Sequence, residues 1–191
     1  MKTEIKILKE FIQNKEPRTI RELSKRIRSD YKITYIATQK LIEKNILYTK
    51  KIGKSTLCSM NEKNITIEII EAEYEQRENI LKIKNITQMY KEITTKIKTS
   101  LFVMVLFGSY VKGTQTRTSD IDILFISNDP LFESKITSII SIIPLKIHPV
   151  IVTEEEFIRM KDSKKSNIIQ EVLNNNIILY GIETYYHLKN A

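Results

Sequence analysis

The sequence predicts an α/β (α+β) protein built from two parts of different character. Apolar residues recur at helical spacing over residues 3–44, and two short β-rich runs follow them. Further along, apolar runs typical of buried strands alternate with segments of helical spacing. Residues 1–60 hold 15 Lys/Arg and 6 Asp/Glu, whereas the rest of the chain is nearly balanced. We therefore expect a basic, mainly helical N-terminal domain and a C-terminal domain with a mixed sheet flanked by helices.

Length and composition narrow the class of protein. A chain of 191 residues forms one or two domains with a real core. No segment approaches the roughly 20 apolar residues that a membrane span needs, and residues 1–15 alternate charged and apolar residues, unlike a signal peptide. The single cysteine, Cys58, excludes a disulfide within the chain and a cysteine-based zinc site. We expect a cytoplasmic protein with no membrane partner.

Three helices and a hairpin are expected in the first 60 residues. The first helix covers residues 3–14, with Thr3 as its candidate cap, and Thr19 is the candidate cap of the second. The third covers residues 32–44, and Ile46–Lys51 and Ser55–Met60 form a hairpin around a glycine turn. We expect Cys58 in the hairpin to be a small buried residue. In the third helix, the apolar stripe is assigned to Ile33, Ile36, Ala37 and Leu41.

Three short helices followed by a basic hairpin resemble a winged helix-turn-helix over residues 1–62. The resemblance implies that the third helix enters the major groove of double-stranded DNA, while the hairpin lies on the phosphate backbone. A balance of +9 in residues 1–60 favours this partner over two alternatives, a protein contact and solubility alone. The residues expected to contact DNA are Tyr31, Lys32, Thr34, Tyr35, Thr38 and Gln39 in the third helix and Lys50, Lys51 and Lys54 in the hairpin.

A connecting helix is expected next. Residues 65–84 lack Pro and Gly and are rich in helix formers, so the connection spans residues 63–85 between the two domains. Its apolar residues exceed what one helix face needs, which favours a contact in a homodimer. A second helix over residues 86–98 begins the C-terminal domain, residues 86–191, and should pack on its sheet.

The stretch from Leu101 to Ser127 organises the C-terminal domain. Residues 101–107 read as a strand buried on both faces that ends at Gly108, and Ser109–Lys112 can form a short helical turn before Gly113. Asp120 and Asp122 stand two apart at the start of the next strand, residues 121–126, so their side chains point to the same side. Paired carboxylates on a strand suit Mg²⁺, which completes its coordination shell with phosphates and water.

At these residues the chain resembles the nucleotidyltransferase superfamily related to DNA polymerase beta, in particular its small prokaryotic members. Their fingerprint is Gly-Ser, ten residues and Asp-x-Asp, and here ten residues separate Ser109 from Asp120. The resemblance implies that an NTP binds at the Gly-Ser turn and that a nucleoside monophosphate passes to an acceptor with Mg²⁺. The residues it assigns are Gly108 and Ser109 for the nucleotide and Asp120 and Asp122 for catalysis and the metal. Lys112 and Arg117 flank the motif and are expected to contact the nucleotide too, because cationic side chains next to a Gly-Ser turn complement a triphosphate. The alternatives are an ordinary turn, a solvated strand entry and surface charges.

The remaining elements complete an α/β sandwich. A helix over residues 131–143 precedes the strand 145–152, and Thr153 with Glu156 forms a capping-box pattern that starts the helix 154–161. A helix over residues 167–175 and a strand over 177–180, closed by Gly181, follow.

The family also places a third carboxylate on the strand that follows Asp-x-Asp, and this chain has no acid there. His148 is the nearest polar residue, and it serves either as a proton acceptor and metal ligand or in a structural role. The acids Glu154, Glu155 and Glu156 either reach the site or form a solvated helix start. Three functions fit: a DNA-associated nucleotidyltransferase, a transcriptional regulator with an inactive nucleotidyltransferase fold, and an antitoxin that modifies a partner protein.

Overall fold

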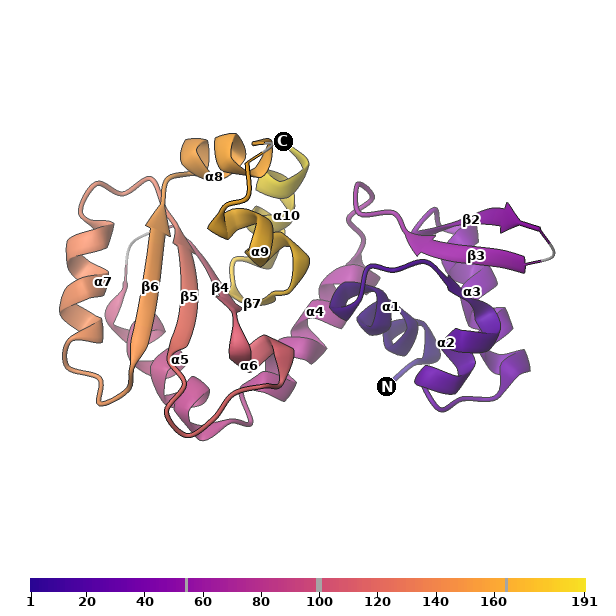
Figure 1. The fold of residues 1–191 in the computed structure, drawn as a ribbon, viewed down its shortest axis with the longest axis horizontal. Helices are drawn as coiled ribbons and strands as arrows, with labels where there is room; N and C mark the ends of the chain where they lie inside the picture. Colours follow the sequence, from indigo (N-terminus) through magenta and orange to yellow (C-terminus); the bar gives the residue numbers. More distant parts are fainter. Residues whose placement is uncertain (54, 99–100, 164) are drawn as a thin grey trace. The chain divides into compact units, whose positions relative to one another are not determined.

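The computed structural model of the protein describes residues 1–53, 55–98, 101–163 and 165–191 (Figure 1). The chain divides into two compact units, Met1–Glu75 (the N-terminal unit) and Gln76–Ala191 (the C-terminal unit). A three-stranded sheet belongs to the first and a four-stranded mixed sheet to the second, so the predicted α/β (α+β) class is confirmed. Within the described ranges, no helix combines the length and apolar character needed to cross a membrane.

The N-terminal unit contains the predicted three helices and hairpin, together with a short strand that the sequence did not indicate. Thr19 caps the second helix as predicted, and Glu22 completes a capping box with it. The prediction for Thr3 was wrong, because the first helix is preceded by Lys2, which makes no side-chain capping bond. The elements are α1 (Thr3–Gln13), β1 (Arg18–Thr19), α2 (Ile20–Arg26), α3 (Tyr31–Glu43), β2 (Leu47–Ile52) and β3 (Ser55–Met60).

The buried face of α3 differs from the predicted one. Thr34 and Thr38 are fully buried together with Ala37 and Leu41, whereas Ile33 and Ile36 are exposed. The two threonines fit because each hydroxyl donates to a carbonyl one turn earlier: Thr34 to Asp30 at 2.8 Å and Thr38 to Thr34 at 2.8 Å. Small side chains at this spacing let α3 lie close to its neighbours, so the helix buries its small face and presents larger apolar residues outward.

The hairpin forms an antiparallel sheet in the order β1-β3-β2. Its register pairs Lys50 with Leu57 and Lys51 with Thr56, so the two lysines point to opposite faces of the hairpin. Cys58 is buried as predicted, and burial raises the pKa of its thiol. Lys54, which was also predicted to contact DNA, lies outside the described residues.

The helical segment between the hairpin and the second sheet is divided in two. The sequence predicted one helix over 65–84, but the observed helix α4 (Ile67–Ile80) is shorter than that. It ends in a turn, and α5 (Lys84–Lys96) begins beyond this turn. Helix α4 runs across the boundary between the two units. Much of the apolar excess of the predicted helix packs within the chain: Ile69 of α4 is fully buried, and Ile80 at its end, with Leu81 and Ile83 beyond it, packs against the core of the C-terminal unit.

The C-terminal sheet has the strand order β6-β5-β4-β7. Its parallel pair is β5 with β6, and β4 runs antiparallel to both of its neighbours. Strand β4 is central and buried along its whole length, as the apolar run predicted, but it starts two residues later than expected and leaves Leu101 exposed. The strands are β4 (Val103–Phe107), β5 (Ile121–Ile126), β6 (Ile147–Val152) and β7 (Ile177–Tyr180).

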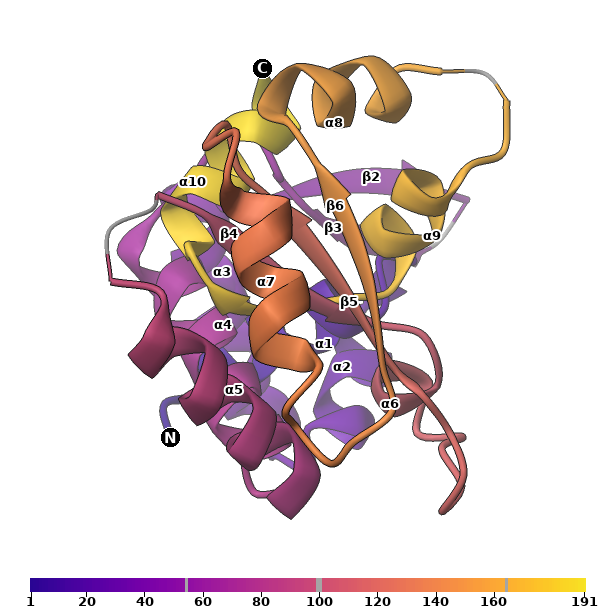
Figure 2. The same ribbon diagram turned by 90° about the vertical axis from the view of Figure 1, so that its left-hand side faces the viewer.

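Helices pack on both faces of this sheet. On one face, alternate strand residues such as Met104 and Ile123 share a core with α5 and α7 (Phe132–Ile140), which lie together in Figure 2. Helix α10 packs on β4 and β7, and α9 packs on β4. Helix α8 contacts both α9 and α10. These last three helices are α8 (Glu154–Lys161), α9 (Ile168–Asn174) and α10 (Ile182–Asn190).

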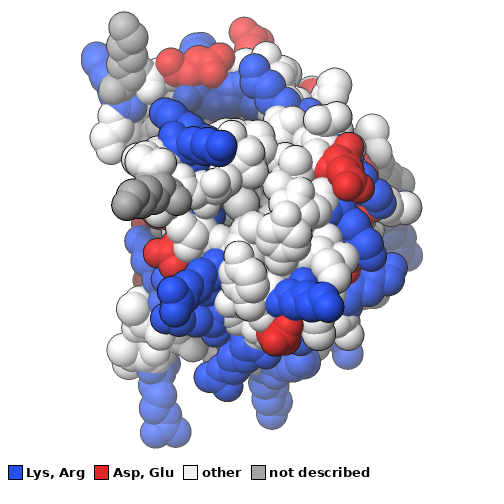
Figure 3. Space-filling model, turned by 90° about the vertical axis from the view of Figure 1, so that its right-hand side faces the viewer, with Lys and Arg blue, Asp and Glu red and all other residues white. Residues whose placement is uncertain are grey.

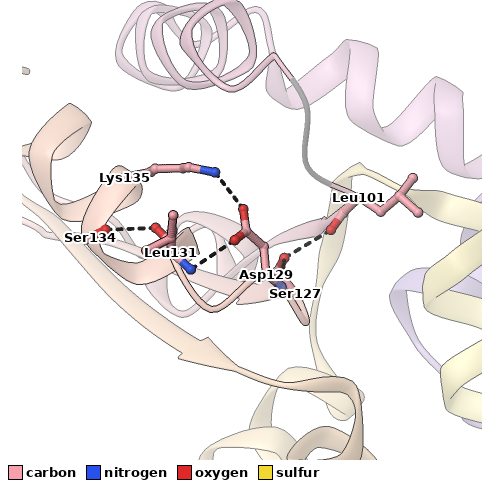
Figure 4. Close-up of polar contacts among 6 residues, drawn as sticks. All are labelled: Leu101, Ser127, Asp129, Leu131, Ser134 and Lys135. Atoms are coloured by element: carbon pink, nitrogen blue, oxygen red, sulfur yellow. Dashed lines mark hydrogen bonds and ion pairs between the residues drawn. The ribbon is translucent and has the colours of Figure 1, made fainter.

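The carboxyl end of β5 is fixed by polar contacts (Figure 4). The buried Ser127 hydroxyl donates to the carbonyl of Leu101 at 3.0 Å. Asp129 accepts from the Leu131 amide at 2.9 Å and pairs with Lys135 Nζ at 2.7 Å, which anchors the start of α7. The candidate site lies at the other end of β5.

Candidate functional site

A glycine turn begins the candidate site at the end of β4. Gly108 has φ +73° and ψ −146°, and α6 (Ser109–Lys112) follows it and is capped by Gly113 in the left-handed αL conformation. A Cβ atom on Gly108 would lie 2.2 Å from Asp122 Oδ2. The backbone conformation therefore favours glycine at residue 108, and a Cβ atom there would displace the Asp122 carboxylate.

The strand register brings Asp122 beside His148. Asp122 pairs with Phe107 on β4 and with His148 on β6, and directly paired residues share a face of the sheet. His148 Nδ1 lies 3.3 Å from Asp122 Oδ1. The Asp122 side chain is 26% exposed and that of His148 is 66% exposed. Asp122 therefore has one oxygen against the glycine turn and the other against an imidazole that solvent reaches.

Asp120 lies exposed immediately before β5. The loop leading to it is ordered by its own side chains, since the Thr116 amide donates to Ser119 Oγ at 2.9 Å and the two hydroxyls lie 3.1 Å apart. Ser119 thus shapes this turn. The resulting strand entry carries two carboxylates.

The donor set matches Mg²⁺ in its chemistry. Two aspartates at a strand entry offer hard oxygen ligands, and Mg²⁺ commonly takes one or two carboxylates and completes its shell with substrate phosphates and water. The space above Gly108, which a larger residue would fill, holds one of these carboxylate oxygens. Among the residues that the structure describes, no three His, Cys, Asp or Glu side chains converge on one point. A metal at this site would therefore draw its other ligands from the substrate and from water.

The two predicted cationic residues differ in their surroundings. Lys112 pairs with Glu171 of α9, Nζ to Oε1, at 2.8 Å, and both side chains are about half exposed. The two also line a polar hollow of about 500 Å³ with the start and end of α9. Arg117 is exposed in the loop before Asp120. The sequence did not indicate Glu171, because a pair 59 residues apart leaves no local pattern.

The acids after β6 lie at the far end of the sheet. Val152 pairs with Ile126, four residues along β5 from Asp122, and four strand residues span roughly 13 Å. Glu156 instead accepts from the Thr153 amide at 2.9 Å, and this hydrogen bond lowers the pKa of its carboxyl. Of the two alternatives for Glu154, Glu155 and Glu156, the geometry favours the helix start.

Some of the residues predicted to contact DNA are exposed on the N-terminal unit. Lys32 and Tyr35 are exposed on α3, and Gln39 is half-buried, whereas Thr34 and Thr38 are corrected to core residues. Lys50 and Lys51 are exposed on β2. A hollow of about 540 Å³ lies between α3, the start of α2 and the start of β3, lined by Thr19, Ile20, Arg21, Tyr31, Tyr35, Gln39, Ser55 and Thr56.

A family model matches the part of the chain that carries the candidate site. Residues 86–175 match the family model of the nucleotidyltransferase domain, over a little less than half of the chain. The matched residues include the glycine turn, both aspartates and His148. A crystal structure described as a toxin-antitoxin with AMP-PNP is 23% identical, covers 56% of this chain and 82% of its own, and has a TM-score of 0.39. No curated protein matches the chain.

Proposed function

We propose that the C-terminal unit transfers a nucleoside monophosphate from an NTP to an acceptor, with pyrophosphate leaving, and that the N-terminal unit binds double-stranded DNA. The observation that carries the transfer activity is the position of Asp122, whose carboxylate lies against the Gly108 turn and beside His148. The match of residues 86–175 to the nucleotidyltransferase domain supports transfer of this kind in general.

Each site residue has a role in this proposal. The Gly108-Ser109 turn receives the triphosphate, with Lys112 and Arg117 beside it as cations. Asp120 and Asp122 hold Mg²⁺, which when bound neutralises negative charge on the phosphate oxygens. Asp122 also orients His148, because an Nδ1 proton donated to the carboxylate leaves Nε2 to accept the proton of the attacking hydroxyl.

A second function, nucleotide sensing without turnover, is favoured by His148 itself. Resemblance to the superfamily implies a third carboxylate on this strand, and the imidazole next to Asp122 is a weaker partner for Mg²⁺ than a carboxylate. The protein would then be a DNA-binding regulator that responds to an NTP. An acceptor that is a partner protein would instead place the chain among antitoxins.

Charge and exposure support DNA as the partner of the N-terminal unit. Its first 60 residues carry a balance of +9, and such an excess binds phosphates regardless of sequence. Exposed Lys32 and Tyr35 on α3 and the exposed lysines of β2 lie on the helix and hairpin that a winged helix-turn-helix presents to DNA.

Calorimetric titration with each NTP, with and without Mg²⁺, tests the nucleotide site. We expect Mg²⁺-dependent binding that weakens by about tenfold or more, or 1.4 kcal/mol, in Asp120→Asn/Asp122→Asn. Asp162→Asn makes the same chemical change at an exposed residue after α8 and should bind like the native protein. Equal binding by the double variant would place the nucleotide elsewhere.

Incubation with NTPs labelled on the α-phosphate separates the two functions. Label transferred to protein or nucleic acid, and lost in the double variant, supports the transferase. Tight, metal-dependent binding with no transfer to any acceptor supports the sensor.

A further inference from the structure

The outward face of α3 is apolar and aromatic in its first half. Ile33 is 54% exposed and Ile36 is 48% exposed, and the exposed Tyr31 and Tyr35 rings lie near each other, with centroids 6.4 Å apart. Single exposed apolar residues are ordinary on a protein surface. Four within six consecutive residues of one helix form a patch, and such patches mark interaction sites.

Few polar groups on this face remain for base recognition. The Thr34 and Thr38 hydroxyls are buried and bonded within the helix. Lys32, Ile36 and Gln39 follow one another at i, i+4 and i+7, on the side opposite the buried residues. Ile36 therefore lies near the middle of the outward face, between a lysine and an amide.

Basic side chains are frequent on the surface of the N-terminal unit. Figure 3 shows Lys and Arg side chains around an uncharged centre, with smaller patches of Asp and Glu between them. The exposed basic residues of the first 53 positions include Arg21, Lys25, Arg28, Lys32, Lys50 and Lys51. Exposed basic side chains on the same unit as an apolar helix face are complementary to the phosphates that flank the major groove.

We propose that α3 recognises DNA through the methyl groups of thymine, with Ile36 as the central contact and Ile33 and Tyr35 beside it. The inference rests on the DNA binding proposed above and names the sequence class that is bound. In the major groove, thymine C5 is the base atom that presents a methyl group to an apolar side chain. Gln39 favours the same base pairs, since a glutamine amide matches N6 and N7 of adenine. The contacted positions should therefore be A·T pairs.

The experiment uses the full chain and DNA duplexes selected by it from a random pool. In the selected duplex, thymines are replaced one at a time by deoxyuridine, which removes the methyl group and leaves base pairing intact. We expect the affinity to fall about fourfold at each contacted position, because the interface then buries one CH₂-sized group fewer.

Variants connect the methyl group to its side chain. Ile36→Ala should weaken binding to the thymine duplex but bind the matching deoxyuridine duplex as the native protein does, because the methyl contact is then absent from both. Ile67→Ala, at an exposed residue of α4, is the matched control and should leave both affinities unchanged.

The outcomes distinguish this inference from the DNA binding on which it rests. Salt-dependent binding with no effect of deoxyuridine at any position, or a selected core of G·C pairs, overturns the methyl contact and keeps DNA binding. An absence of binding to any duplex overturns both. Ile36→Ala with native affinity for the thymine duplex would remove Ile36 from the DNA contact and also overturn the proposal.

Discussion

The carboxylate of Asp122 lies where a side chain on Gly108 would begin, with Oδ2 2.2 Å from the position of a Cβ atom. This proximity couples the glycine turn to the strand that carries the acids. The turn and the acidic strand entry therefore act as one geometric unit, although 13 residues lie between Gly108 and Asp122.

Gly108→Ala should disturb both stability and the site. A backbone with φ +73° and ψ −146° is sparsely populated by residues with a Cβ atom and costs such a residue about 1–3 kcal/mol, and the added methyl group also displaces Asp122. We expect lower stability to urea and weaker Mg²⁺-dependent NTP binding. Gly113→Ala is the control, since Gly113 also has a positive φ, in the αL region, but no atom lies within 4 Å of its Cβ position. Equal loss of NTP binding in both variants would contradict a role for the Asp122 contact.

His148→Asp should make the site more dependent on metal. Two carboxylates would then face each other without a cation, and two unit charges 4 Å apart repel by about 1 kcal/mol in water. We expect the free energy of unfolding to fall by that amount in EDTA and to recover with Mg²⁺. His148→Asn, which adds no charge, should show little dependence on Mg²⁺. Identical unfolding of His148→Asp with and without the metal would argue against a shared cation site.

Local signals predicted much of the C-terminal unit. Strand β4 ends at a glycine, as predicted, and strand β7 covers the predicted residues. The capping box of Thr153 and Glu156 begins α8 at the predicted residue. These features depend on neighbouring residues, so the sequence alone carries them. Placing His148 next to Asp122 depended instead on the register of two strands 26 residues apart, which composition does not encode.

The face of α3 shows where sequence reasoning failed. The apolar stripe was assigned by side-chain hydrophobicity, which placed Ile33 and Ile36 inside and two threonines outside. The structure has the reverse arrangement, because each threonine hydroxyl donates a hydrogen bond to the backbone carbonyl one turn earlier. The small threonine side chains also allow α3 to pack closely against its neighbours. The ion pair of Lys112 and Glu171 was missed for a different reason, because it is made by tertiary structure alone.

Lys51 and Lys50 should differ in their effect on DNA binding. Lys51 shares a hairpin face with Thr56, which lines the hollow beside α3, whereas Lys50 points to the other face. Each lost phosphate contact lowers the slope of log K against log salt by about 0.9. We expect Lys51→Ala to lose about one such contact and Lys50→Ala to lose less. Fluorescence anisotropy of a labelled duplex over a range of salt measures the slopes. Indistinguishable slopes for the two variants would show that the hairpin does not present one face to DNA.

The ion pair between Lys44 and Glu68 should make the N-terminal unit sensitive to acid. It joins the end of α3 to the first turn of α4, and the hydrogen bond from Lys44 lowers the pKa of Glu68. A lowered pKa in the folded state stabilises the fold above the ordinary glutamate pKa of about 4.3, and that stabilisation is lost as the pH falls through the lowered value. We expect Glu68→Gln to be less stable than the native protein at pH 7, with the difference shrinking as the pH falls below about 4.3. Glu16→Gln, at an exposed residue between α1 and β1, is the control and should differ little from the native protein at any of these pH values. Urea unfolding followed by circular dichroism at several pH values measures both differences, and a Glu68→Gln effect that stayed constant with pH would contradict the ion pair as its cause.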